Sequence, residues 1–144
     1  MRLKIFLRSF VVLFFIFSVN SADISNQEEE KANFRFLQKV QGAANILAGA
    51  TLFCDPIDSS QFIAAQALFM STLDLANFKV VDLENEETKN KAMGHLLSAS
   101  LNASAAYSIL YGTAEYYFTC DPKYIYFGSM LLVSAGVNTI LRSY

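Results

Sequence analysis

Two stretches decide the predicted fold: Phe53-Cys54-Asp55-Pro56 and its near copy later in the chain, Thr119-Cys120-Asp121-Pro122. In each of them an aspartate precedes a proline between two long apolar runs. The carboxylate accepts free amide hydrogens at a helix start, and a proline at the first helical position has no donor to lose. Proline also disfavours helical geometry in the residue before it, so the preceding helix ends there. Each stretch therefore predicts the compact corner of an antiparallel helical hairpin.

The segments between these corners have the periodicity of helices. Before the first corner, apolar residues recur at spacings of three and four, among them Phe34, Leu37, Val40, Ala44 and Leu47. Two corners predict an all-α fold, an up-down-up-down four-helix bundle made of two helical hairpins. We expect the bundle over residues 32–144, with hairpins at 32–80 and 91–144 and a linker at 81–90.

The N-terminal segment has the parts of a secretory signal peptide. Arg2, Lys4 and Arg8 precede the apolar run 10–17, and small and polar residues follow it up to Ser21. We expect a signal peptide at 1–21, cleavage after Ser21, and a mobile acidic lead-in at 22–31. The protein is then exported through the secretory pathway. The alternative is an uncleaved membrane anchor.

The charge of the mature chain excludes one class of partner. Removing three basic residues with the signal peptide leaves 8 basic against 13 acidic residues, a net charge of −5. Nucleic acids require a basic surface, so we expect no nucleic acid partner. One domain of this length is large enough to bury a core.

The two cysteines predict one disulfide bridge. An exported chain with two cysteines is read first as cross-linked, and in an up-down-up-down bundle both corners lie at the same end. Cys54 and Cys120 would then come within the roughly 4.4–6.8 Å between Cα atoms that a bridge requires. The alternative is a pair of free, buried thiols.

The sequence is compatible with either lipid or neighbouring proteins around the bundle. The runs 40–54, 59–73, 96–114 and 124–141 contain no charge, whereas a bundle in water carries charges on the outer face of each helix. Tyrosines 116, 117, 124 and 126 resemble an interfacial aromatic belt. Against a membrane, the first two runs are shorter than a spanning helix requires, and the basic residues would lie on the exported side. A free soluble monomer is the least favoured reading.

A few polar side chains within the apolar helices are candidate site residues. Asp74 lies 19 residues after Asp55, and Arg35 lies 19 residues before Cys54, which predicts a structural Asp74–Arg35 ion pair. Glu115 is a possible buried acid at the level of the tyrosines, and a proton or cation site is its functional reading. His95, the only histidine, is expected to be half-exposed.

Motifs that carry chemistry are not found in this sequence. It has no Glu-x-x-His pair for a di-iron centre, no Cys-x-x-Cys-His, no phosphate-binding glycine loop and no Gly-x-Ser-x-Gly elbow. We therefore expect no enzymatic activity, no cofactor and no metal site. Asn102-Ala103-Ser104 matches a glycosylation sequon but lies within a predicted helix.

These observations predict a non-enzymatic structural or accessory subunit of an exported membrane or envelope assembly. Its partners would be protein neighbours or further copies of itself, with a membrane as a possible one. The alternative function is a helical carrier that binds a lipid or another apolar molecule between its helices. Four aromatic residues are the possible lining of that ligand site: Phe62, Phe69, Tyr107 and Tyr111. A third reading, a proton- or ion-conducting element, would require Glu115 to face a wet cavity.

Overall fold

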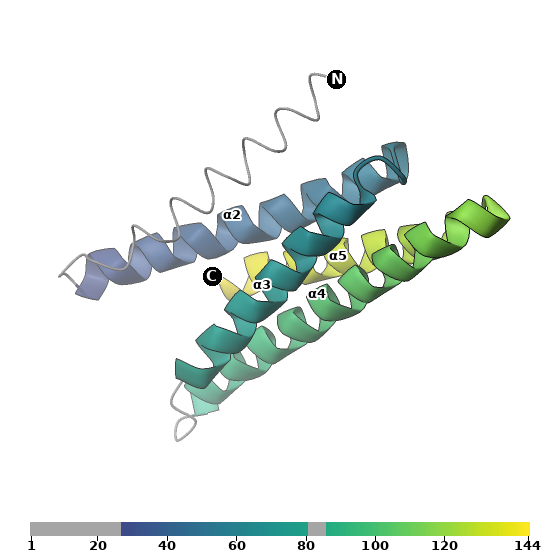
Figure 1. Cartoon of the computed structure of the whole chain (residues 1–144). Helices are drawn as coiled ribbons and strands as arrows, with labels where there is room; N and C mark the ends of the chain where they lie inside the picture. Colours follow the sequence, from purple (N-terminus) through teal and green to yellow (C-terminus); the bar gives the residue numbers. More distant parts are fainter. Residues whose placement is uncertain (1–26, 81–85) are drawn as a thin grey trace.

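Four long helices make up the part of the chain that the structure describes, residues 27–80 and 86–144 of a computed structural model. They are α2 (Gln27–Cys54), α3 (Ser60–Val80), α4 (Glu86–Thr119) and α5 (Lys123–Arg142) (Figure 1). No strand occurs in these two ranges. The predicted all-α fold with four packed helices is confirmed. The predicted signal peptide and residues 22–26 and 81–85 lie outside the described residues.

Neighbouring helices run in opposite directions. Gly42 and Gly49 of α2 lie against Gly136 and Ser129 of α5, so residue numbers rise along one helix as they fall along the other. The same reversal relates α3 to α4, through Ser71 with Ala99 and Asp74 with His95. Since α2 begins at Gln27 and α4 at Glu86, part of the predicted lead-in and part of the predicted linker are helical.

The bundle is open along one of its four edges. α2 packs along α5, α5 along α4 and α4 along α3, whereas α2 and α3 make little direct contact. Figure 1 shows α2 and α3 diverging from the corner that joins them. α2 and α4 are therefore diagonal neighbours across the bundle, and so are α3 and α5.

The two corners differ although they share Cys-Asp-Pro. At the first, Asp55 Oδ1 accepts the amide hydrogen of Asp58 at 3.3 Å, and residues 56–59 form a turn before α3 begins at Ser60. At the second, Cys120 has a left-handed backbone with φ 56°, and Asp121 Oδ1 accepts the amide hydrogen of Lys123 at 3.1 Å. The predicted helix start at Pro56 is too early, because the turn intervenes.

The core is built from small residues. Among the described residues, nine of the fifteen buried hydrophobic ones are alanines, which lets the helix backbones approach closely. Larger side chains fill the core near the corners, chiefly Leu52, Ile63, Ile109, Ile125 and Leu132. In the same part of the chain, fifteen polar or charged residues are buried alongside them, as many as the buried hydrophobic ones.

Candidate functional site

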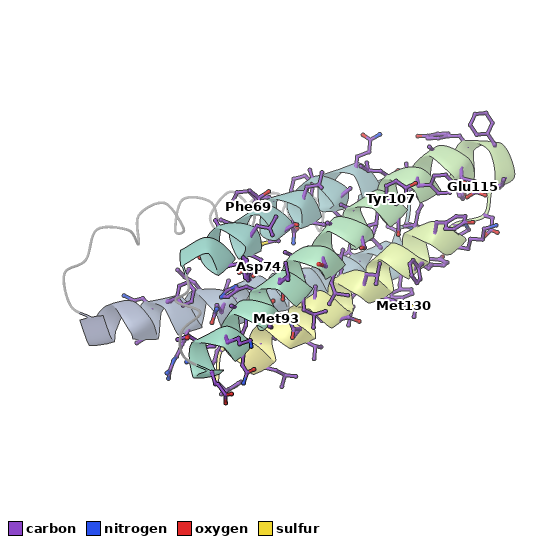
Figure 2. All side chains as sticks on the ribbon, turned by 90° about the horizontal axis from the view of Figure 1, so that it is seen from below. Phe69, Asp74, Met93, Tyr107, Glu115 and Met130 are labelled. Atoms are coloured by element: carbon purple, nitrogen blue, oxygen red, sulfur yellow. The ribbon has the colours of Figure 1, made fainter. Side chains whose placement is uncertain are left out.

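Asp74 of α3 is fully buried, and one polar side chain from each of the other three helices contacts it. His95 of α4 places Nδ1 3.0 Å from Asp74 Oδ1, and Arg142 of α5 donates Nη2–H to the same oxygen at 3.0 Å. Gln41 of α2 donates Nε2–H to Oδ2 at 3.5 Å. Figure 2 shows Asp74 between the helices. We call Gln41, Asp74, His95 and Arg142 the Asp74 cluster.

The Asp74 cluster holds a buried ion pair. The side chain of Asp74 is 0% exposed and that of Arg142 is 6% exposed. A charge in such surroundings is stable only when an opposite charge and hydrogen bonds compensate it. Arg142 balances the charge of Asp74, and Nδ1 of His95 lies within hydrogen-bond distance of the same carboxylate oxygen.

Glycine makes room for this arrangement. A Cβ atom on Gly94 would lie 2.7 Å from Cδ of Arg142, so the stem of the arginine crosses α4 at this position. Next to it, Asn138 Nδ2 donates to the Gly94 carbonyl oxygen at 3.1 Å and to Ser98 Oγ at 2.7 Å. These contacts hold α4 and α5 in register beside the cluster.

A second polar contact crosses the bundle nearer the corners. Asn45 Nδ2 of α2 donates to Asn102 Oδ1 of α4 at 3.0 Å, and both residues are fully buried. Asn45 Oδ1 and Asn102 Nδ2 have no hydrogen-bond partner. Since Asn102 is at the centre of the fold, its sequon is inaccessible to glycosylation in this structure.

Arg142 and His95 occupy the place that was predicted for Arg35. The predicted Asp74–Arg35 pair is wrong: Arg35 is exposed, and the carboxylate is paired with Arg142. The physical reason is the turn at 56–59, which lengthens the chain between the helices without adding height along the bundle. Counted from the helix ends, Asp74 lies about as far after Ser60 as Gln41 lies before Cys54, so Gln41 is level with Asp74.

The predicted disulfide is not formed: Cys54 and Cys120 are free and exposed. Both corners do lie at one end of the bundle, where Phe53 beside Cys54 stacks on Tyr126 of α5 at 5.5 Å between ring centroids. Cys54 ends α2, however, and Cys120 follows the end of α4. Because these two helices are diagonal neighbours, their ends do not approach to the distance that a bridge requires.

The four aromatic residues predicted to line a ligand site do not share an internal surface. Phe62 and Phe69 are half-buried on α3, whereas Tyr107 is 71% exposed and Tyr111 is exposed on α4. The rings of Tyr107 and Tyr111 stack on each other at 6.2 Å, and Tyr111 meets Tyr124 of α5 edge-on at 5.0 Å. The tyrosines therefore form an outer aromatic ridge along α4 and α5.

The expectations for Glu115 and His95 also change. Glu115 is partly exposed and has Lys123 Nζ at 3.8 Å from Oε1, so it is not the lone acid of an apolar site. His95 was expected to be half-exposed, but it is 4% exposed and bonded to Asp74. The signal for His95 was its spacing from Ser98 and Asn102, which are buried on the same face of α4.

Large apolar side chains gather on the outside of the bundle. Exposed ones occur on every helix. Those of α2 and α3 include Phe34, Phe36, Leu47, Leu68 and Leu75, and those of α4 and α5 include Met93, Leu97, Leu110, Phe127, Met130, Val137 and Leu141. Figure 2 labels Met93 and Met130 among these side chains. The arrangement differs from that of a typical bundle in water, because polar side chains share the interior with apolar ones and many large apolar side chains lie outside.

A charge-free belt surrounds the bundle between two charged rims. At the corner end the rim is marked by Asp55, Glu115 and Lys123, and at the other end by Lys39 and Lys91. Between the rims, the described residues contain three side chains of Asp, Glu, Lys, Arg or His, namely Asp74, His95 and Arg142, and all three side chains are buried. At about 1.5 Å per residue, the belt is about 24 Å tall along α2, about 28 Å along α5 and about 36 Å along α4.

One helix of the described part, α5, is long and apolar enough by composition to cross a membrane, and most of it is not buried in the bundle. No three His, Cys, Asp or Glu side chains of residues 27–80 and 86–144 come together as ligands of a metal ion would. No family model, curated protein or solved structure matches the chain.

Proposed function

We propose that this protein is a non-enzymatic structural or accessory subunit whose four-helix bundle is embedded in the lipid bilayer of a membrane assembly. The observation that carries the proposal is the distribution of polarity: Asp74, His95, Asn45 and Asn102 are buried, while many phenylalanine, leucine and methionine side chains are exposed on the outside of the helices. In lipid, small and polar residues pack helices together, and ionisable residues face the bundle interior.

The height of the charge-free belt supports lipid as the covering. The hydrocarbon core of a bilayer is about 30 Å thick, and the belt spans about 24 to 36 Å along the helices. If Asp74 is counted as a charge on the outer surface, the charge-free run of α3 is too short to span a bilayer. Because Asp74 and His95 point inward, the outer surfaces of α3 and α4 stay uncharged over a longer distance.

The residues at the rims fit a membrane interface. Tyr117 and Tyr124 are exposed at the corner end, where tyrosine rings favour the head-group region. At the other end, Lys39 Nζ lies 4.0 Å from the centre of the Tyr144 ring, and long lysine side chains reach from a helix end to the interface.

Two experiments test the proposal. After carbonate washing of membranes that contain the protein, we expect it in the membrane pellet, and we expect detergent to release it. Recovery in the carbonate supernatant would contradict embedding in lipid. Released protein that runs with other membrane proteins in mild detergent would support its role as a subunit of an assembly.

The second experiment separates a lipid-facing surface from a water-facing one. Met130 is 57% exposed within the belt, and Phe118 is 89% exposed beyond the Glu115 rim. In lipid, Met130→Asp costs about 2.5–3.5 kcal/mol of insertion free energy, whereas the matched control Phe118→Asp costs much less at the interface. In water both substitutions change stability by about 0.5 kcal/mol or less. Equal behaviour of the two variants in a membrane-insertion assay would contradict the proposal.

A further inference from the structure

The outward face of α2 carries a seven-residue repeat. Gln38, Asn45 and Leu52 are buried at intervals of seven, so one face of this helix points into the bundle along its length. On the opposite face, residues recur at alternating spacings of three and four over three heptads, which is the pattern of the a and d positions in paired helices. We call these residues the α2 seam: Asn33, Phe36, Val40, Ala43, Leu47, Ala50 and Cys54. Val40 is half-buried and the others are exposed, so the seam is an outer surface of the bundle.

The other helices of the chain leave the α2 seam uncovered. α2 packs along α5 but makes little contact with α3, from which it diverges in Figure 1. Gly42 and Gly49 mark the side of α2 that lies against α5, and neither glycine belongs to the seam. The seam is therefore free to pack against a helix from another molecule.

The residues of the seam suit a second copy of the same helix. Its a positions within the charge-free belt are Val40 and Leu47, and its d positions there are Ala43 and Ala50. The larger side chains project, while the alanines let a neighbouring backbone approach closely. No charged residue interrupts the seam, so a symmetric pair, which sets each residue against its own copy, meets no like-charge repulsion.

Asn33 favours a like partner over an unlike one. It is at an a position of the seam and is exposed. A single asparagine at an a position specifies the register of paired helices, because it pairs with an asparagine at the same height. Against an apolar residue its amide would lose that hydrogen bond. Among possible partners, a second copy of α2 in the same register satisfies it.

A membrane restricts how two copies can pair. Copies inserted with the same topology are related by a two-fold axis along the membrane normal, which makes their α2 helices parallel. Each seam residue then lies at the height of its own copy, and Cys54 faces Cys54 of the second copy. Cys120 follows the end of α4, the diagonal neighbour of α2, so the two Cys120 residues lie apart.

We propose that two copies of this protein pair in parallel through the α2 seam, with Cys54 beside Cys54 of the second copy. The parallel orientation rests on the proposed embedding in a bilayer, to which this inference adds the partner and the contact surface. Packing of the seam holds the pair together. The two thiols stay free until an added oxidant removes two electrons and two protons from them.

The native cysteines supply the first test. Membranes that contain the full chain are treated with copper phenanthroline in air, and the proteins are separated on a gel without reductant. We expect a cross-linked dimer in the parent chain and in Cys120→Ser, and none in Cys54→Ser. A dimer that persists in Cys54→Ser, or that is lost in Cys120→Ser, would overturn the proposal.

A cysteine at the far end of the seam tests the direction of the pair. In the Cys54→Ser/Cys120→Ser background, Phe36→Cys should form a cross-linked dimer. Arg35→Cys is the matched control, since Arg35 is exposed one residue away but lies outside the seam, and it should not. Equal cross-linking of the two variants would indicate random collision and refute the pairing. Cross-links between Phe36→Cys and Cys54, without those between like positions, would show antiparallel helices and would also refute it.

A larger side chain tests the packing of the seam. Ala43 is exposed, so Ala43→Phe does not disturb the interior of the bundle. In the pair, however, it overfills the contact between the two α2 helices, and we expect the constant for dimer formation to fall by about tenfold or more. Ala103→Phe, at an exposed position of α4, is the control and should cross-link through Cys54 as the parent does. Equal yields from the two variants would contradict a contact at Ala43.

Carbonate washing of the same membranes separates this proposal from the proposed function. Protein that stays in the pellet without cross-linking at Cys54 supports the embedding and refutes the pairing. Protein that cross-links at Cys54 and at Phe36→Cys but is recovered in the supernatant supports the pairing and contradicts the embedding.

Discussion

Arg142 Nη2 lies 3.0 Å from Asp74 Oδ1, so a buried ion pair joins α5 to α3 across the diagonal of the bundle. These two helices do not pack along each other, because each of them packs on α4. A polar contact thus connects two helices that do not pack along each other.

Removing one partner of the ion pair should destabilise the fold strongly. Arg142→Leu leaves Asp74 as an uncompensated buried charge, and we expect a loss of about 3–5 kcal/mol in the free energy of unfolding. The double variant Asp74→Asn/Arg142→Leu removes both charges and should lose less than the sum of the single variants. Unfolding midpoints in denaturant measure this. Arg35→Leu, on the exposed surface, is the control and should change stability by about 0.5 kcal/mol or less. Strict additivity of the two single variants would show that the pair is not coupled.

A methyl group between α2 and α5 should force these helices apart. A Cβ atom on Gly136 would lie 2.5 Å from the carbonyl oxygen of Gly42 and 2.8 Å from Ile46 Cγ1. The backbone cannot yield as a flexible side chain does, so we expect Gly136→Ala to destabilise the bundle by about 1–3 kcal/mol. Ser134→Ala, exposed on the same helix, is the matched control. Thermal unfolding of the two variants at the same midpoint would contradict the close approach.

Both thiols should react in the folded protein without prior reduction. Cys54 and Cys120 are free and exposed, on the ends of diagonal helices. We expect a maleimide reagent to label both of them, as counted by mass spectrometry, and Cys54→Ser to remove one of the labels. Labelling that appears only after treatment with a reductant would show a bridge and would contradict the structure.

Glycine should have opposite effects at the two cysteines. Cys120 has φ 56°, a left-handed conformation that costs a residue with a Cβ atom roughly 1–2 kcal/mol and costs glycine almost nothing. Cys120→Gly should therefore stabilise the protein by about 1 kcal/mol. Cys54→Gly, in the last residue of a right-handed helix, should bring no gain. The two unfolding midpoints, compared with that of the parent chain, measure the difference, and a gain at both positions would refute this account.

Local chemistry accounts for the parts of the fold that were predictable. Asp followed by Pro marked both corners, and helical periodicity between the corners predicted four helices. The turn after Pro56 was not predictable from the same signal, because Asp55 accepts the amide hydrogen of Asp58 instead of starting the helix at once. Because of that turn, Asp74 lies at the height of Gln41 along the bundle and not at the height of Arg35. The predicted ion pair was therefore wrong.

The sequence alone indicated only one part of the Asp74 cluster. Asp74 stood out as an acid in an apolar helix, but His95 and Arg142 are 21 and 68 residues away along the chain. The spacing of His95 from Ser98 and Asn102 puts the three residues on one face of α4, but only the structure shows that this face points inward. The same lack of information led to the predicted bridge between Cys54 and Cys120, since matching corners do not reveal that their helices are diagonal.

By itself, the sequence determined the helices, their approximate ends and the absence of charge along their middle portions, because capping, proline geometry and periodicity act within a few residues. Only the tertiary structure decided which polar groups meet and which side chains remain outside. Those outcomes depend on how the helices are rotated about their axes, and that rotation is set by close contacts such as those of Gly42 with Gly136 and Gly94 with Arg142.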